Sequence, residues 1–179
     1  LLNAYQMEIS IKYSKLDHLE PKPTLFYEFH GSETANKESI SLVEEISNNN
    51  GGSQFKWAEN TEDRKKLWKA RHEVYYSVKA LRPNTRVYTT DACVPISRLA
   101  ECIKFTEEKI KEYGLEAPIV GHVGDGNFHC TVLYDPKNEK DNKTIREFSN
   151  ELINKTLELD GTVTGEHGIG INKKEYLIK

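Results

Sequence analysis

A hairpin signal near the middle of the chain restricts the fold more than any other feature of the sequence. Gly-Asp-Gly at residues 124–126 separates two apolar runs, PIVGHV at 118–123 and NFHCTVLY at 127–134. A turn of this chemistry between two apolar runs is typical of a β-hairpin. Because hairpin strands run in opposite directions, at least part of the sheet is predicted to be antiparallel.

The length of the loop decides which residues of the hairpin face each other. A four-residue loop at 124–127 pairs Val123 with Phe128 and places His122 directly opposite His129. Opposed residues point to the same face of a sheet, with Cβ atoms roughly 4.5–5.5 Å apart. Two imidazoles so placed can chelate one metal ion, while Val123 and Phe128 point to the opposite face, into the core.

Helical and strand patterns alternate along the rest of the chain. Apolar residues recur at helical spacing in the stretches 2–14, 36–52, 61–82, 95–113 and 142–160. The apolar sides of 36–52 and 142–160 are expected to point inward. Further short strands are predicted at 24–31, 53–59, 86–94 and 162–164. This order predicts an α+β fold, a ferredoxin-like antiparallel sheet with helices packed on one face. We expect a single domain over residues 1–179, because this length is usual for one domain.

Composition excludes several classes of protein. The 25 basic residues are interspersed with 28 acidic ones, for a net charge of −3, so nucleic acid is not an expected partner. No apolar run reaches the ~18 residues of a membrane span. The three cysteines are scattered, which argues against a disulfide framework and for a reducing compartment. The chain does not begin with methionine, and we expect it to be a piece of a longer protein.

Glu166 is the natural third ligand for a metal ion held by His122 and His129. It lies in the glycine-rich segment GEHGIG at 165–170, whose backbone can wrap closely around a ligand. Two histidines and one carboxylate leave coordination positions open, as catalytic metal sites do. His167 follows directly, and its ordinary pKa of about 6.5 suits a general base beside the metal.

Other interpretations of these two segments stay open. A histidine pair across a hairpin is more often a surface or hydrogen-bonded pair than a metal site. GEHGIG can be a plain glycine loop of a non-catalytic module, or a phosphate-binding nest, although it lacks the spacing of a nucleotide-binding loop. A metal-dependent hydrolase such as a phosphoesterase is the alternative enzyme, but that class uses more aspartates to hold two metals. The joint occurrence of both segments favours the metal site.

Arg71 is a second polar signal. It falls inside the apolar helical stripe that Leu67, Val74, Tyr75 and Val78 form. An arginine in this place can lay its stem on the core and extend its charge to solvent. It can equally hold the carboxylate of a ligand through two hydrogen bonds, and both roles stay open.

Several segments together resemble a known family. GHVGDGNFHC and GTVTGEHGIGINKKEYL are similar to the C-terminal substrate domain of FAD-linked 2-hydroxy-acid dehydrogenases. PTLFYEFHGS, LWKARHEVYYS and VYTTDACVPISRL support the match, so the resemblance runs from about residue 20 to the end. These motifs are long and specific, and they most resemble the mitochondrial, cytochrome-reducing D-lactate dehydrogenases.

The resemblance implies a flavin-dependent D-lactate dehydrogenase whose N-terminal FAD-binding domain lies outside this chain. Such an enzyme oxidises D-lactate and other D-2-hydroxy acids to pyruvate and other 2-oxo acids, passes hydride to FAD and sends electrons to cytochrome c in mitochondria. It implies zinc or manganese on His122, His129 and Glu166. It also implies proton transfer to His167 and a substrate carboxylate held by Arg71, the roles argued above from the residues themselves.

Two positions depart from the members of the family that oxidise 2-hydroxyglutarate. Thr89 stands where they carry a lysine for the distal carboxylate, and Tyr75 stands where they carry a threonine. The loss of a distal cation favours a monocarboxylate such as D-lactate. We expect the substrate-binding residues to be Arg71, Tyr75, Thr89 and Thr131. The usual family C-terminus is missing after KKEYL, so this chain alone is expected to be inactive, and an exposed apolar face could make it self-associate.

Overall fold

The computed structural model describes residues 1–16, 19–58 and 60–178. The chain forms two compact units, one of Leu1–Thr24 with Ala70–Lys179 and one of Leu25–Lys69. A single domain over residues 1–179 therefore stays a prediction. Among the described residues, no helix combines the length and the apolar character that crossing a membrane requires.

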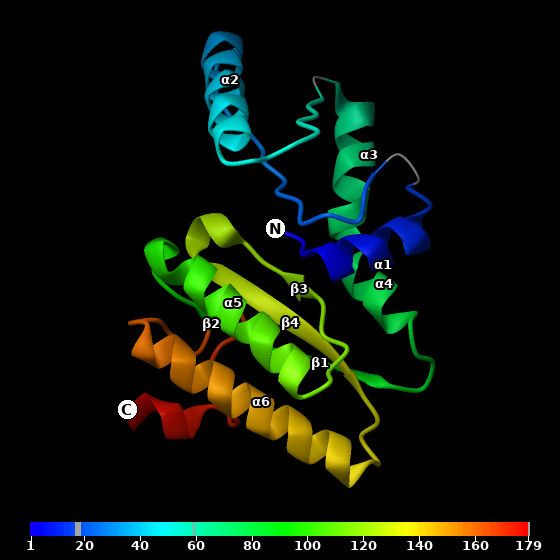
Figure 1. Cartoon of the computed structure of the whole chain (residues 1–179), viewed down its shortest axis with the longest axis vertical. Coiled ribbons are helices and arrows are strands. Elements are labelled where there is room, and N and C mark those ends of the chain that lie inside the picture. The colour runs from blue at the N-terminus through cyan, green and yellow to red at the C-terminus, as the bar shows by residue number, and fades with distance from the viewer. Residues whose placement is uncertain (17–18, 59, 179) are drawn as a thin grey trace. The chain divides into compact units, whose positions relative to one another are not determined.

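The larger unit is built around one long strand that pairs with all the others (Figure 1). The strands are β1 (Arg86–Thr89), β2 (Ala92–Cys93), β3 (Ile119–Val120) and β4 (Asn127–Tyr134). All pairs are antiparallel, and β1 and β2 follow β4 in one continuous register, with Thr89 opposite Thr131 and Ala92 opposite Phe128. The strand predicted at 86–94 is thus confirmed, with an interruption at 90–91.

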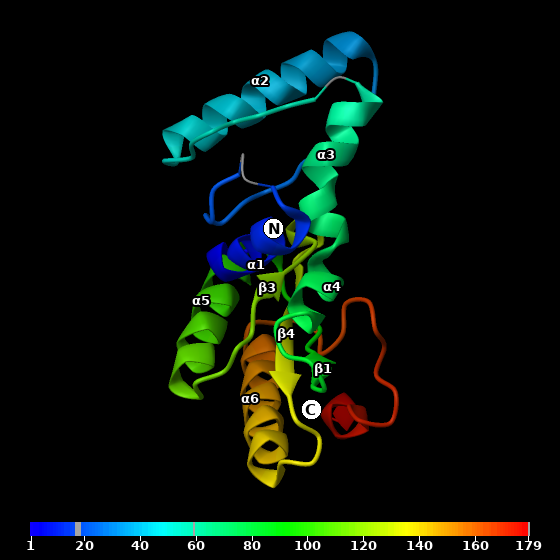
Figure 2. The ribbon, with the colours of Figure 1, turned by 90° about the vertical axis from the view of Figure 1, so that its right-hand side faces the viewer.

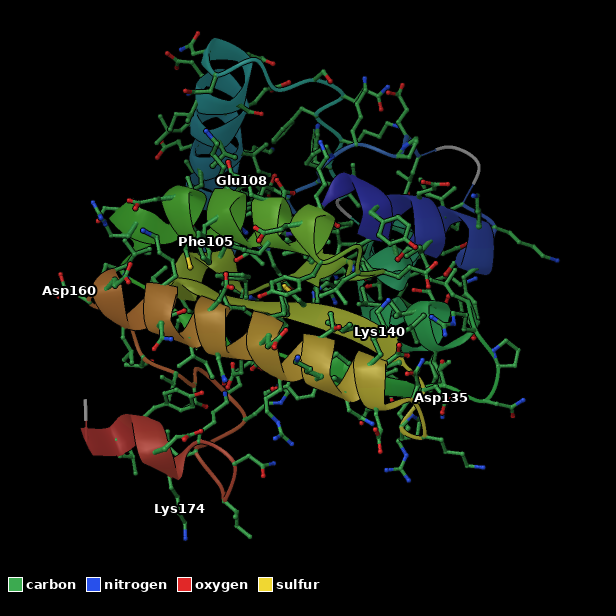
Figure 3. All side chains as sticks on the ribbon, turned by 60° about the horizontal axis from the view of Figure 1, so that its bottom comes forward. Phe105, Glu108, Asp135, Lys140, Asp160 and Lys174 are labelled. Atoms are coloured by element: carbon green, nitrogen blue, oxygen red, sulfur yellow. The ribbon has the colours of Figure 1, made fainter. Side chains whose placement is uncertain are left out.

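Helices α5 (Ile96–Glu112) and α6 (Glu139–Glu158) cover one face of this sheet, where they lie side by side (Figures 1 and 3). Phe105 of α5 has the ammonium groups of Lys109 and Lys155 within 5.7 and 5.8 Å of its ring centroid. The main core lies under the two helices and consists of Ala92, Val94, Leu99, Cys102, Ala117, Ile119, Phe128, Cys130, Val132, Ile145, Phe148, Leu152 and Leu159. Both helices were predicted from their apolar spacing, and the α+β prediction is confirmed.

The second face of β4 is also covered. Figure 2 shows β4 between α5 and α6 on one side and α4 (Val74–Lys79) on the other, and α1 (Ala4–Ser14) packs against α4. The stretch predicted as one helix at 61–82 is instead α3 (Thr61–His72) and α4, because Glu73 between them has ψ near 6° rather than a helical value.

Because side chains alternate along a strand, β4 presents different residues to its two faces. Phe128, Cys130 and Val132 point into the core under α5 and α6. His129 and Thr131 point to the other face and are 7% and 4% exposed. The candidate site is thus on the face that α5 and α6 leave free. All three cysteines are free, as predicted, and burial raises the pKa of the Cys130 thiol to about 12.

The smaller unit contradicts three sequence predictions. Residues 25–31 and 53–58 form no strand. The stretch at 36–52 is helical, as α2 (Glu33–Asn49), but α2 has no buried residue, so its apolar side was wrongly predicted to point inward. Aromatic and β-branched residues favour a strand only where a neighbouring strand is available to pair and pack with, and all four strands of the fold pair within the other unit.

The predicted register of the hairpin is wrong. Val120, rather than His122, lies opposite His129, and the connection covers residues 121–126. A 3-10 turn, η1 (Val123–Asp125), forms there, in which the Asp125 N–H donates to the His122 carbonyl at 2.9 Å. The turn uses the His122 carbonyl, which extending the pairing of β3 with β4 by two more residues would need. His122 therefore lies in the loop.

Gly126 fixes where this loop ends. Its φ is +76°, and a Cβ added there would lie 2.0 Å from the carbonyl oxygen of Val94. We expect Gly126→Ala to lower the free energy of unfolding by about 2–3 kcal/mol, because it adds left-handed strain to a backbone clash. Gly124→Ala is the matched control, since its Cβ would meet nothing within 4 Å. Equal urea midpoints for the two variants would contradict this account.

Candidate metal and substrate site

Glu166 brings the two predicted histidine ligands together. Its Oε1 lies 2.7 Å from Nδ1 of His122 and 3.5 Å from Nε2 of His129. The same oxygen accepts a hydrogen bond from Nδ2 of Asn127 at 2.8 Å. The grouping therefore depends on the loop after α6, which Figure 2 shows in orange and red on the side of β4 opposite α5 and α6, and not on hairpin pairing.

The tautomers of both histidines follow from their partners. Nδ1 of His129 is 2.9 Å from the carbonyl oxygen of Thr90, which can only accept, so Nδ1 carries a proton, while Nε2 faces Glu166. Nη2 of Arg71 lies 2.8 Å from Nε2 of His122 and can only donate. His122 therefore donates its own proton, on Nδ1, to Glu166.

The charges of the cluster are set by burial and by these neighbours. Burial raises the pKa of the Glu166 carboxyl, but His122 and His129 together lower it by more. The pKa therefore lies below its ordinary value, and the group is ionised at neutral pH. Burial lowers the pKa of the Arg71 guanidinium, and Glu166 opposes this. An ionised carboxylate, two imidazoles and one guanidinium thus share the site.

Asp91, which was not predicted from the sequence, holds the loop that carries Glu166 and His167. Its carboxylate is buried between β1 and β2 and accepts the Thr164 hydroxyl at 2.6 Å and the backbone N–H groups of Glu166 and His167 at 3.1 and 2.9 Å. Burial raises the pKa of Asp91, but these bonds lower it more, and the pKa ends below its usual value. The available signal was an acidic residue inside a predicted strand.

His167 lies next to His129, with the two ring centroids 5.1 Å apart, and its residue is exposed. Ligand atoms of His167, His129 and Asp91 all lie within 4.8 Å of one another. Asp91 already accepts several hydrogen bonds and Nδ1 of His129 donates to Thr90. We therefore interpret Asp91 as a hydrogen-bonded support rather than as a metal ligand.

The residues predicted to bind substrate divide into two groups. Arg71 contacts His122, and Thr131 lies two residues along β4 from His129, opposite Thr89. Thr89 and Thr131 thus share the site face of the sheet, and Arg71 reaches His122 from α3. Tyr75 is 50% exposed and has its ring 5.7 Å from that of Tyr76. Among the described residues, Tyr75 makes no hydrogen bond or ring contact with the histidines of the site.

The donor set is of the kind that holds a divalent cation. His122, His129 and Glu166 offer imidazole nitrogens and carboxylate oxygens, and such a set leaves coordination positions open. In the structure both imidazoles lie against Oε1 of Glu166. Asn127 is 3% exposed, and its Oδ1 has no hydrogen-bond partner among the described residues, so a buried acceptor lies beside Glu166. Gly165 is needed there, because its Cβ would lie 2.5 Å from Cγ of Asn127.

Comparison with known proteins gives one family for the whole chain. The family described as "FAD linked oxidases, C-terminal domain" matches residues 2–179. "Probable D-lactate dehydrogenase, mitochondrial" of Danio rerio is 49% identical over 155 residues, which cover 87% of this chain and 31% of that protein. "D-lactate dehydrogenase [cytochrome], mitochondrial" of Arabidopsis thaliana is 36% identical over 179 residues, 100% of this chain and 31% of that protein.

The chain thus spans about a third of the length of these relatives. Among solved structures, a 4-ethylphenol oxidase from Gulosibacter chungangensis, in complex with isoeugenol, matches with a TM-score of 0.50. The two are 18% identical, and the match covers 74% of this chain and 28% of the oxidase. At this identity the likeness concerns the fold alone.

Proposed function

Because the chain belongs to the family of FAD-linked oxidase C-terminal domains, we propose that it is the substrate- and metal-binding domain of a flavin-dependent D-lactate dehydrogenase. The observation that carries this proposal is that one carboxylate oxygen of Glu166 lies within 3.5 Å of both His122 and His129, while Arg71 is at hydrogen-bond distance from His122. The names of the Danio and Arabidopsis relatives support D-lactate as substrate and a mitochondrial location. Pyruvate is then the product, because it is the 2-oxo acid that the oxidation of lactate at C2 gives.

In this proposal the site activates the substrate hydroxyl. A divalent cation, zinc or manganese, on His122, His129 and Glu166 would act as a Lewis acid that lowers the pKa of that hydroxyl. His167 takes the hydroxyl proton, since its imidazole lies beside His129 and its backbone is fixed by Asp91. FAD, held mainly by a domain outside this chain, would be the oxidant that accepts the hydride from C2.

Arg71 holds the substrate carboxylate. Its guanidinium is partly buried and now donates to the lone pair of His122 Nε2, a nitrogen that can also bind a cation. A bound cation would compete with Arg71 for that nitrogen, and the fork of donors on Arg71 would then match a carboxylate. Thr89 and Thr131 would flank the rest of the substrate from β1 and β4, and Tyr75 would contact it from α4. Thr89 supplies no cation for a second carboxylate, which favours a monocarboxylic acid.

The partners follow from the same assignment. Cytochrome c is the proposed electron acceptor, in line with the name of the Arabidopsis relative. Self-association of the isolated chain is also proposed, because Ile171 and Leu177 are 84% and 65% exposed. The alternative of a metal-dependent hydrolase is not retained, because the matching family consists of FAD-linked oxidases.

The test is calorimetric titration of D-lactate into the chain, first stripped of metal and then loaded with Zn²⁺ or Mn²⁺. We expect binding only in the loaded protein. Arg71→Ala should weaken it roughly 10- to 100-fold, because a hydrogen bond to a charged group contributes about 1.5–3 kcal/mol. Arg64→Ala is the control, since Arg64 is exposed and pairs with Glu28. Equal binding of D-lactate without metal, or hydrolysis of a phosphate ester, would contradict the proposal.

A further inference from the structure

Asp91 takes no part in the chemistry proposed above, yet it is among the most enclosed polar groups of the larger unit. Its side chain is 1% exposed, although it carries a charge. Burial of an unpaired charge is costly, so such a group is normally surrounded by hydrogen bonds. Here nearly all the bonds come from one short segment, Thr164–His167.

That segment has no secondary structure of its own to hold it. From Val163 to Gly170, no described backbone N–H donates to a backbone carbonyl. Instead the N–H groups of Glu166 and His167 donate to Asp91, and the N–H of Gly168 donates to Oγ1 of Thr164 at 2.7 Å. Since the Thr164 hydroxyl itself donates to Asp91, one carboxylate organises three consecutive amides.

Asp91 and its neighbour Thr90 also hold the His129 ring in place. The carbonyl of Thr90 accepts from Nδ1 of His129, and Oδ1 of Asp91 lies 3.6 Å from that nitrogen. The ammonium group of Lys173 reaches the carbonyl of Asp91 at 3.4 Å and also bonds to that of Val163. Residues 90 and 91 therefore hold β4 on one side and the Glu166 loop on the other.

We propose that Asp91 is the positioning residue of the site, and that it places the Glu166 carboxylate and the His167 ring against His129 through the backbone of the loop. This inference rests on the proposed metal site for its consequence, but the anchoring itself does not need a metal. Groups that orient metal ligands typically change metal affinity by ~10- to 100-fold when they are removed. Asp91 would do so without touching the metal or the substrate.

Two variants test the proposal. Asp91→Asn keeps the shape but turns an N–H donor toward the amides of the loop. Thr164→Val removes the hydroxyl between Asp91 and Gly168 and leaves the buried charge, so it keeps the test available if Asp91→Asn does not fold. Thr164→Ser restores the hydroxyl and should restore wild-type behaviour. Asp125→Asn is the matched control, since Asp125 is an exposed aspartate in the neighbouring loop.

Two readouts are needed, Co²⁺ affinity from the visible absorption of the bound ion and amide hydrogen exchange by NMR. We expect Asp91→Asn and Thr164→Val to lower Co²⁺ affinity by ~10- to 100-fold. Protection should be lost at Glu166, His167 and Gly168 while the amides of β4 stay protected. Unchanged affinity and protection would overturn the inference, as would a uniform loss of protection that includes β4. If the wild type binds no Co²⁺ but the loop amides still lose protection in the variants, the metal proposal fails and the anchoring by Asp91 stands.

Discussion

His129→Ala is expected to lower the affinity of the chain for Zn²⁺ or Mn²⁺ by roughly 10³-fold. Structural zinc sites bind with apparent free energies of about 10–16 kcal/mol, and a one-third share among three protein ligands is about 4 kcal/mol. The His129→Ala variant should lose that full share, because Thr90 holds the His129 ring with its Nε2 facing Glu166. Competition with a chromophoric chelator measures the change.

His30→Ala is the control for this prediction. The His30 side chain is 82% exposed and belongs to the smaller unit, so its removal should leave metal affinity unchanged. Glu166→Gln should resemble His129→Ala, because the amide keeps the shape and removes the charge that the cation needs. If His129→Ala keeps the wild-type affinity, the assignment of ligands is wrong.

Removal of the proposed base has the second large effect. In the longer enzyme that we propose to contain this chain, His167→Ala is expected to lower kcat for D-lactate by ~10²- to 10⁴-fold, the usual contribution of a general base. KM should change little, because Arg71 and the metal, rather than His167, hold the substrate. Steady-state kinetics with an artificial electron acceptor measures both constants.

A conservative variant separates a base from a packing residue. If His167 accepts the proton, His167→Gln should be no more active than His167→Ala, although glutamine fills a volume closer to that of histidine. Recovery of kcat in His167→Gln, or an effect confined to KM, would show that His167 is not the base. A metal content equal to wild type is required of both variants.

Helices were predicted more accurately than strands. α5 and α6 appear with the predicted apolar sides buried, because the spacing of apolar residues within one helix is a local property. Of the strands predicted at 24–31 and 53–59, the described residues 25–31 and 53–58 form none, because a strand needs a partner that its own sequence does not provide. The hairpin lies between these cases, with its strands located correctly and its register set by η1.

The candidate site divides in the same way. His122, His129, Glu166 and His167 were singled out by residue type and by their glycine-rich surroundings, and the structure gathers them on one face. Cross-strand pairing was the wrong mechanism for that grouping, since Glu166 joins the histidines from a loop 37 residues after His129. Asn127 and Asp91 were not predicted, because nothing in the neighbouring sequence shows that a polar side chain supports a distant loop.

The sequence by itself determined which residue types could carry metal and acid–base chemistry, where the two helices α5 and α6 run and that the central pairing is antiparallel. These properties depend on turn chemistry, apolar spacing and the donor atoms of single side chains. Only the tertiary structure decided that Arg71 meets His122 and that Asp91 organises the loop of Glu166 and His167. Those contacts join residues 51 to 76 positions apart, and hydrogen bonds over such separations follow from the packing of the whole unit around β4 rather than from any local pattern.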